Sequence, residues 1–256
     1  MRPVWRIARR EWMEQVRQPG ALLAPILTFL VIDGVVAAVA LLLGQITATA
    51  SPDDLLARLG VQATVLTGAA SLVVHTHAFL GFSQLIGLCA VNAGHAVLHD
   101  RQLGTLSFLL LAPLRRWEFL CGKLLGSTAI PLIAGSVLNL AGALVLATSA
   151  PTAAAGAGLL PTEPAWWVAW ALGCPAWCLL VSAVATVVGA LSRDVRSAQQ
   201  AVWFVLLFSA VFASTLLTAQ MAAGPWAELA VAGVGAGGTI VAIATGAAVL
   251  SRDLWR

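Results

Sequence analysis

Long apolar runs separated by short polar segments dominate this sequence. Six stretches hold no charged side chain or only one: residues 21–44, 61–98, 124–162, 164–192, 197–227 and 229–251. A helix needs about 20 apolar residues to cross the hydrocarbon core of a bilayer. The strands of a membrane barrel would instead be segments of about 10 residues with alternating polarity, which these runs lack. The pattern predicts an all-α, polytopic membrane protein with six transmembrane helices.

These runs lead us to expect a single transmembrane domain over residues 1–256. An amphipathic interfacial helix precedes the first span, and a short cytoplasmic segment separates the second and third spans. The expected segments are 1–19 (interfacial), 100–117 (cytoplasmic) and, for the spans, 21–44, 66–98, 120–147, 165–191, 198–219 and 229–250.

The composition narrows the class of protein. Hydrophobic residues make up 60% of the chain and charged residues 10%, and the mean hydropathy is +0.91. Soluble domains carry about 45–50% apolar and about 25% charged residues, so these values exclude a soluble domain and a disordered chain. The 4 cysteines are scattered through apolar stretches without metal-type spacing, and we interpret them as small hydrophobic residues.

The basic residues indicate an orientation. Of the 14 Lys and Arg residues, all but Arg58 lie before the first span, between the second and third, between the fourth and fifth, or after the sixth. Basic residues near helix ends stay on the cytoplasmic side, so both termini are expected in the cytoplasm. The net charge of +3 does not indicate nucleic-acid binding, because the basic residues do not form one continuous face.

The residues before the first span form two faces on a helical wheel. One stripe consists of Trp5, Ala8, Trp12 and Val16, and the opposite one of Arg6, Arg10 and Arg17. Such a helix lies in the inner interface, with its rings toward acyl chains and its guanidinium groups toward anionic headgroups. At this level it is either a positive-inside anchor or a coupling element.

The segment after the second span reads HDRQLGTLSFLLLAPLRRWEFLCGK over residues 99–123. Gly104 can end the second helix, and Thr105 can cap a new short helix that Pro113 stops. The short helix has an apolar stripe of Leu106, Leu109 and Leu110. This stripe predicts a contact, either with a partner protein or with the inner ends of the chain's own bundle.

Three segments together resemble the permease subunits of ATP-binding-cassette transporters of the type-two exporter family. They are IARREWMEQVRQP at residues 7–19, DRQLGTLSFLLLAPLRRWEFLCGK at 100–123 and LSRDVRSAQQ at 191–200. Each segment is degenerate by itself. Their order and their positions between six predicted spans extend the resemblance over essentially the whole chain.

The resemblance implies a homodimer or heterodimer of such subunits in the inner (plasma) membrane, bound to two cytoplasmic ATPase subunits. No G-x-x-x-x-G-K-[ST] motif is present, and the only lysine, Lys123, precedes Leu124. ATP and Mg²⁺ therefore belong on the partner, and we expect no catalytic, cofactor or metal site on this chain. The expected ATPase-coupling residues are Gly104, Thr105, Leu106, Leu109, Leu110, Pro113, Arg115 and Arg116, flanked by Glu11 and Arg17.

Polar residues inside the apolar runs are candidates for the translocation path. Asp33 lies near the middle of the first run, where a charge costs at least about 2.5–3.5 kcal/mol. It is either a pathway residue or a hydrogen-bonded carboxyl that holds the first span to its neighbours. His75 and His77 in the second run are its possible partners.

Other protein classes use similar residues. An ion-coupled secondary transporter or channel would use Asp33 and the membrane histidines as its ion site. An intramembrane hydrolase would need a zinc motif, but His95 and His99 flank Ala96 where H-E-x-x-H has its glutamate. A membrane scaffold without transport is a further alternative.

Overall fold

The computed structural model describes residues 2–17, 63–104, 115–149, 169–192 and 225–253, together with single residues and short runs of two or three residues between these ranges. Every regular element in these ranges is helical, which confirms the all-α class for the described residues. The helices are α1 (Arg2–Arg17), α4 (Ala63–Gln102), α6 (Arg116–Ser149), α8 (Cys174–Leu191) and α10 (Pro225–Asp253), and the π-helical turn η1 (Ala169–Gly173) directly precedes α8.

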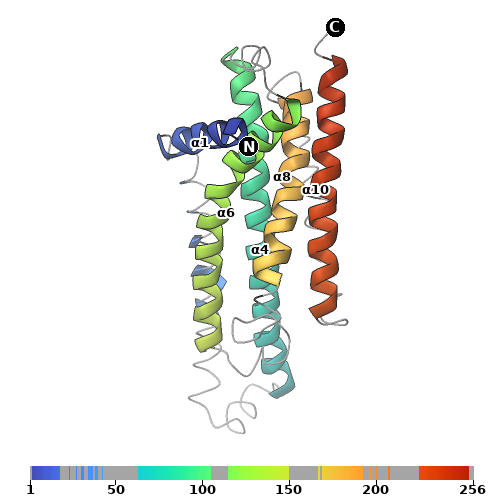
Figure 1. Cartoon of the computed structure of the whole chain (residues 1–256). Helices are drawn as coiled ribbons and strands as arrows, with labels where there is room; N and C mark the ends of the chain where they lie inside the picture. Colours follow the sequence, from blue (N-terminus) through green and yellow to red (C-terminus); the bar gives the residue numbers. More distant parts are fainter. Residues whose placement is uncertain are drawn as a thin grey trace.

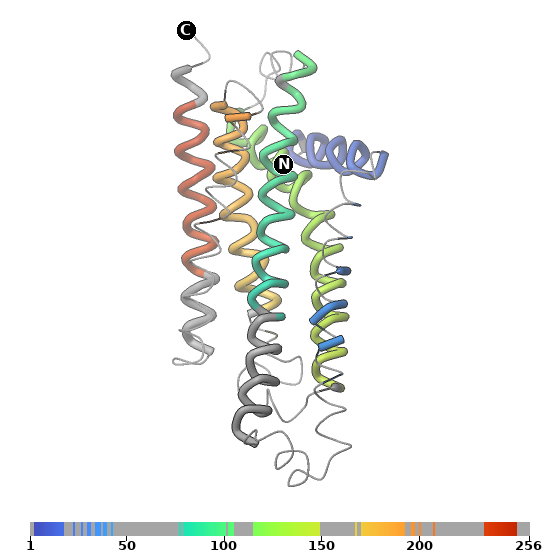
Figure 2. The backbone as a smooth tube through the Cα atoms, turned by 180° about the vertical axis from the view of Figure 1, so that it is seen from behind, coloured from blue at the N-terminus to red at the C-terminus, as the bar shows by residue number. Residues whose placement is uncertain are grey.

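Four long helices stand side by side, and α1 lies across them near one end of the bundle (Figures 1 and 2). α4, α8 and α10 end at the end of the bundle where α1 lies, whereas α6 begins there (Figure 1). α4 packs between α6 and α8, and α10 packs against α8. α4, α8 and α10 therefore run in one direction through the bundle, and α6 runs in the opposite direction.

Among the described residues, three helical segments are long and apolar enough to cross a membrane. They are Phe79–Asp100 with 22 residues, Arg116–Thr148 with 33 and Trp170–Leu191 with 22, and a shorter apolar helix covers Gly233–Val249. A 22-residue helix is about 33 Å long, close to the thickness of a hydrocarbon core. Most residues of the predicted first and fifth spans lie outside the described part.

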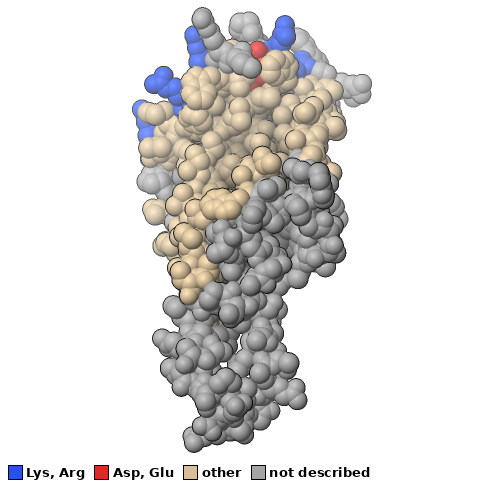
Figure 3. All heavy atoms as spheres, turned by 60° about the horizontal axis from the view of Figure 1, so that its bottom comes forward, with Lys and Arg blue, Asp and Glu red and all other residues tan. Residues whose placement is uncertain are grey.

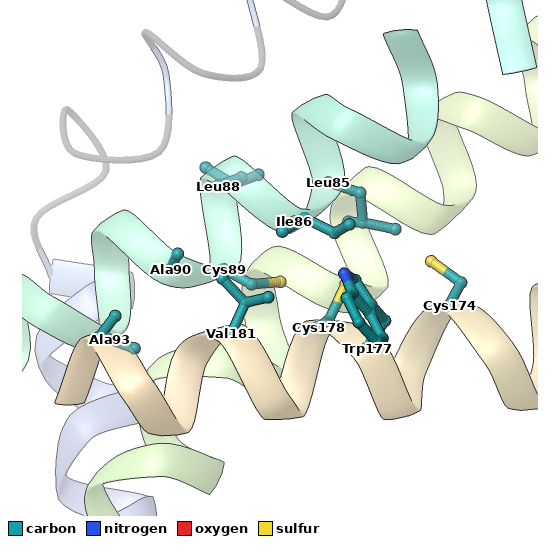
Figure 4. Close-up of a cluster of buried hydrophobic side chains, with 11 residues drawn as sticks. Leu85, Ile86, Leu88, Cys89, Ala90, Ala93, Cys174, Trp177, Cys178 and Val181 are labelled. Carbon is teal, nitrogen blue, oxygen red and sulfur yellow. The ribbon is translucent and has the colours of Figure 1, made fainter. Parts of the chain in front are cut away.

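The hydrophobic core lies between α4 and α8 (Figure 4). α4 contributes mainly aliphatic side chains and Cys89, and α8 contributes Trp177, Val181 and two cysteines. Cys89, Cys174 and Cys178 are free thiols with 0–1% exposure. They occupy core positions, as expected for small hydrophobic side chains.

Local signals mark the helix ends. α4 ends at Gln102, and Gly104 has φ +69°, a left-handed conformation that favours glycine after a helix. At the start of α6, the Arg115 N–H donates to Glu118 Oε2 at 2.9 Å, which is half of a capping box. Pro175 has no N–H and cannot donate a hydrogen bond to the carbonyl of residue 171. The π-helical turn η1 continues into α8 at this point.

Charged side chains gather at the end of the molecule that carries α1. In Figure 3, the Lys and Arg side chains of the described residues lie at this end, and the remaining described surface in that view is uncharged. A bilayer would leave charges outside its apolar core. The charge distribution thus distinguishes the α1 end from the rest of the described bundle.

Candidate functional site

α1 crosses α6 at a close approach over two glycines. A Cβ atom on Gly122 would lie 2.7 Å from the Ile7 Cβ. A Cβ atom on Gly126 would lie 2.5 Å from the Glu11 Cβ and 3.0 Å from the Ala8 Cα. Glycines four residues apart lie on one helix face and let helices approach closely in membranes. α1 can therefore pack this closely on α6 only because residues 122 and 126 have no side chain. Ala8 is 1% exposed in this contact.

A buried charge cluster joins three helices beside this crossing. Lys123 of α6 forms ion pairs with Glu11 of α1 and Asp100 of α4, and all three side chains are buried. The Lys123 ammonium also donates to the Ala96 carbonyl of α4 at 3.2 Å. Arg10 lies at the edge of the cluster, 3.4 Å from Asp100. We call Glu11, Asp100, Lys123 and Arg10 the charge cluster.

The charges of the charge cluster compensate one another, which lowers the free-energy cost of burying them. One ammonium and one guanidinium face two carboxylates, so the four charges sum to zero. Arg10 is also held by Glu14, one helical turn away, at 2.8 Å. Buried ion pairs contribute little net stability, but removal of one partner leaves a buried charge uncompensated. The charge cluster therefore makes α1, α4 and α6 depend on one another.

Burial raises the pKa of the Glu11 carboxyl above its ordinary value of 4.5. Desolvation is the largest cause, and the nearby carboxylates of Asp100 and Glu14 act in the same direction. The ion pair and the hydrogen bond with Lys123 oppose this rise. Folding thus makes the ionisation of Glu11 harder.

Two further side chains of α1 bind the backbone of α6. The Gln15 amide Nε2 donates to the carbonyls of Gly126 and Ser127, both at 3.3 Å. The Trp12 indole N–H donates to the Leu125 carbonyl at 3.4 Å. α1 is therefore attached to α6 by backbone packing, by the charge cluster and by side-chain donors.

The remaining surface of α1 has an aromatic side and a basic side. Trp5 and Val16 are 59% and 65% exposed, and the Trp5 and Trp12 rings meet edge to face at 5.0 Å. Arg6, Arg9 and Arg17 are exposed. The predicted lipid-facing stripe included Ala8, but Ala8 packs on α6 instead, because the glycines of α6 admit it there.

The structure describes only the ends of the predicted coupling segment. Gly104 is exposed at the end of α4, and Arg115 is exposed directly before α6. Arg116, the first residue of α6, is half-buried. The predicted residues Thr105, Leu106, Leu109, Leu110 and Pro113 lie outside the described residues. Both described ends lie at the end of the bundle that carries α1 and the charge cluster.

Glu11 and Arg17 were expected to flank a docked ATPase, which stays a prediction, and the exposure of their two side chains differs. Arg17 is exposed in the last turn of α1. Glu11 is 4% exposed and faces Lys123 inside the bundle. Of these two residues, only Arg17 offers its side chain to a partner surface in this structure.

The predicted translocation residues are described only in part. Asp33 and the side chain of His75 lie outside the described residues. His77 is buried with 3% exposure and precedes Phe79, the first residue of the apolar segment of α4. From Asp100 to His77 is roughly 35 Å along the helix, so His77 lies about one hydrocarbon thickness from the charge cluster. Within the described ranges, no three His, Cys, Asp or Glu side chains are arranged to hold a metal ion.

Sequence reasoning missed the charge cluster. Lys123 entered the sequence analysis only through the orientation and the missing P-loop, and no ion pair of Lys123 with Glu11 or Asp100 was predicted. Two signals were present: the single lysine of the chain, and the four-residue spacing of Gly122 and Gly126 around it. Neither signal identifies α1 as the partner of α6, because a close helix contact can form with any neighbouring helix.

Comparison with known proteins identifies the family. The family model described as ABC-2 family transporter protein matches residues 5–254. No curated protein and no solved structure matches the chain. The family match covers nearly the whole sequence and agrees with the apolar helices, the end-located charges and the absence of strands among the described residues. The chain is therefore a membrane permease of ABC-2 type and belongs to the ABC-2 transporter family.

Proposed function

We propose that this chain is the membrane-spanning subunit of an ATP-driven exporter in the inner (plasma) membrane. It has six spans and both termini in the cytoplasm. The basic end of the bundle supports this orientation, because basic residues are retained on the cytoplasmic side. α8 ends and α10 begins at opposite ends of the bundle, which agrees with a span over residues 198–219.

Two copies of the permease, identical or related, form the translocation path with two cytoplasmic ATPase subunits. ATP and Mg²⁺ bind to the ATPase subunits, because this sequence lacks a P-loop. Asp33, His75 and His77 are the polar residues assigned to the path. An ion-coupled transporter or channel built on these residues is not favoured, because the family match supports an ABC-2 permease.

The charge cluster is the observation that carries the coupling mechanism. The coupling segment leaves α4 shortly after Asp100 and enters α6 shortly before Lys123. A force applied to this segment therefore acts on two helices that are ion-paired to each other and to Glu11 of α1. A ligand shifts a conformational equilibrium only through different contacts in the two states. Leu106, Leu109 and Leu110 supply the proposed contact with the ATPase.

Purification of the tagged permease from its own cells tests this function. A P-loop ATPase should co-purify in a fixed ratio to the permease, and ATP hydrolysis should be found with that protein. Leu103→Asp is a matched control for loop variants, because Leu103 is 59% exposed at the end of α4 and lies outside the proposed stripe. A permease that purifies without an ATPase and still transports would contradict the proposal.

A further inference from the structure

Pro131 leaves one backbone carbonyl of α6 without its helical donor. Proline has no N–H, so Pro131, inside α6, cannot donate to the carbonyl four residues earlier, that of Ser127. Proline within a helix also bends it. α6 bends in the region where α1 lies across it, in both views of the bundle (Figures 1 and 2).

Gln15 supplies a donor to this same carbonyl. Its Nε2 lies 3.3 Å from the Ser127 carbonyl and 3.3 Å from the neighbouring Gly126 carbonyl. The Gln15 Oε1 atom is buried and accepts no hydrogen bond from the described residues. The two donations to α6 are therefore the polar contacts that orient the Gln15 amide.

The other side-chain hydrogen bonds at the bend do not involve the carbonyl that Pro131 leaves without a donor. Trp12 donates to the Leu125 carbonyl, but residue 129 carries an N–H that can serve this carbonyl within the helix. The Ser127 hydroxyl donates to the Lys123 carbonyl at 2.7 Å, a back-bond of the kind that bends helices. Only the Gln15 contact meets a carbonyl that Pro131 leaves without a donor.

We propose that Gln15 replaces the donor missing at Pro131 and thereby sets the bend of α6. As a result, α1 and the part of α6 that follows Pro131 move together. Displacement of α1 would withdraw the donor from Ser127 and leave a buried carbonyl unpaired, which is unfavourable. The bend of α6 would then become variable. Gln15 is a positioning residue, and its role in transport rests on the proposed function, whereas its effect on the bend does not.

The test measures the bend directly in the full-length permease in lipid nanodiscs. Spin labels replace Trp117 and Leu144, which are 43% and 49% exposed near opposite ends of α6, in a cysteine-free background. Along a straight helix these positions are roughly 40 Å apart, within the range of pulsed dipolar spectroscopy. We expect a narrow distance distribution in the parent protein and one about twice as wide in Gln15→Leu.

A Pro131→Ala background separates the proposed role from general packing. Alanine at position 131 restores the donor for the Ser127 carbonyl, so Gln15→Leu should leave the distribution of Pro131→Ala unchanged. Trp12→Phe is the matched control and should keep the parent distribution. An unchanged distribution in Gln15→Leu, or equal broadening with and without Pro131, would overturn the proposal.

Two further outcomes are decisive. If Gln15→Leu does not fold, Gln15→Leu/Pro131→Ala must fold, and failure of both would contradict the proposal, because the restored donor should rescue the helix. If no ATPase binds the permease, the proposed function is wrong, but the distance measurements still test the role of Gln15.

Discussion

Lys123 of α6 is ion-paired with Glu11 of α1 in a contact where both side chains are almost completely buried. The same ammonium pairs with Asp100 of α4. One lysine therefore joins a helix predicted to lie in the membrane interface to two helices that are long enough to cross the membrane. A force on any one of these three helices therefore acts on the other two.

Removal of the central cation should be strongly destabilising. Lys123→Met leaves Glu11 and Asp100 as buried carboxylates with only Arg10 nearby, and we expect a loss of about 3–5 kcal/mol in unfolding free energy. The triple variant Glu11→Gln/Asp100→Asn/Lys123→Met should recover much of this loss, because no buried charge is left unpaired. Thermal unfolding of the purified permease measures both effects.

A surface arginine provides the control for this experiment. Arg6 is exposed on α1, and Arg6→Ala should change stability by at most about 0.5 kcal/mol. If Lys123→Met were as mild as Arg6→Ala, the charge cluster would not hold the helices together.

The raised pKa of Glu11 predicts a pH dependence of stability. The folded protein binds the Glu11 proton more tightly than the unfolded chain, whose pKa is near the ordinary value of 4.5. The stabilisation from this proton is fully present below that value and is lost as the pH rises through the folded-state pKa. The melting temperature of the wild type minus that of Glu11→Gln should therefore fall as the pH rises from below 4.5 to above it. A difference that stays constant over this range would show that folding does not shift this carboxyl.

Gly126→Ala should loosen α1 from α6. Its methyl group would lie 2.5 Å from the Glu11 Cβ and 3.0 Å from the Ala8 backbone, so α1 must move. We expect a loss of about 1–3 kcal/mol, as for other overpacked contacts. Gly237→Ala in α10 is the matched control, because a Cβ there meets nothing within 4 Å, and it should be neutral or slightly stabilising. Equal melting temperatures for the two variants would argue against a tight crossing.

The orientation can be tested by labelling single cysteines in intact cells. Cysteines introduced at Asp54 and Thr162 should react with a membrane-impermeant reagent from outside, and cysteines at Gln102 and Ser197 should not. This expectation follows from the distribution of Lys and Arg between the predicted spans. The opposite labelling pattern would reverse the proposed orientation.

The helical class and the amphipathic first helix follow from sequence periodicity, because long apolar runs and a basic stripe have few other physical solutions. The partners of individual side chains do not follow from it. Ala8 fits a lipid-facing stripe by position, yet it packs on Gly126 of α6. Glu11 looks like a surface residue on a basic helix, yet it is buried in the bundle in an ion pair with Lys123. Such contacts depend on how distant helices meet, which a one-dimensional pattern does not contain.

Recruitment of the ATPase by a loop variant tests the coupling mechanism most directly. Leu109→Asp/Leu110→Asp should abolish binding of the partner ATPase, because two charges replace the proposed apolar contact. The melting temperature of the permease itself should stay nearly unchanged, and the Leu103→Asp control should keep the ATPase bound. Binding of the ATPase to the double variant at wild-type affinity would contradict the coupling role of this segment.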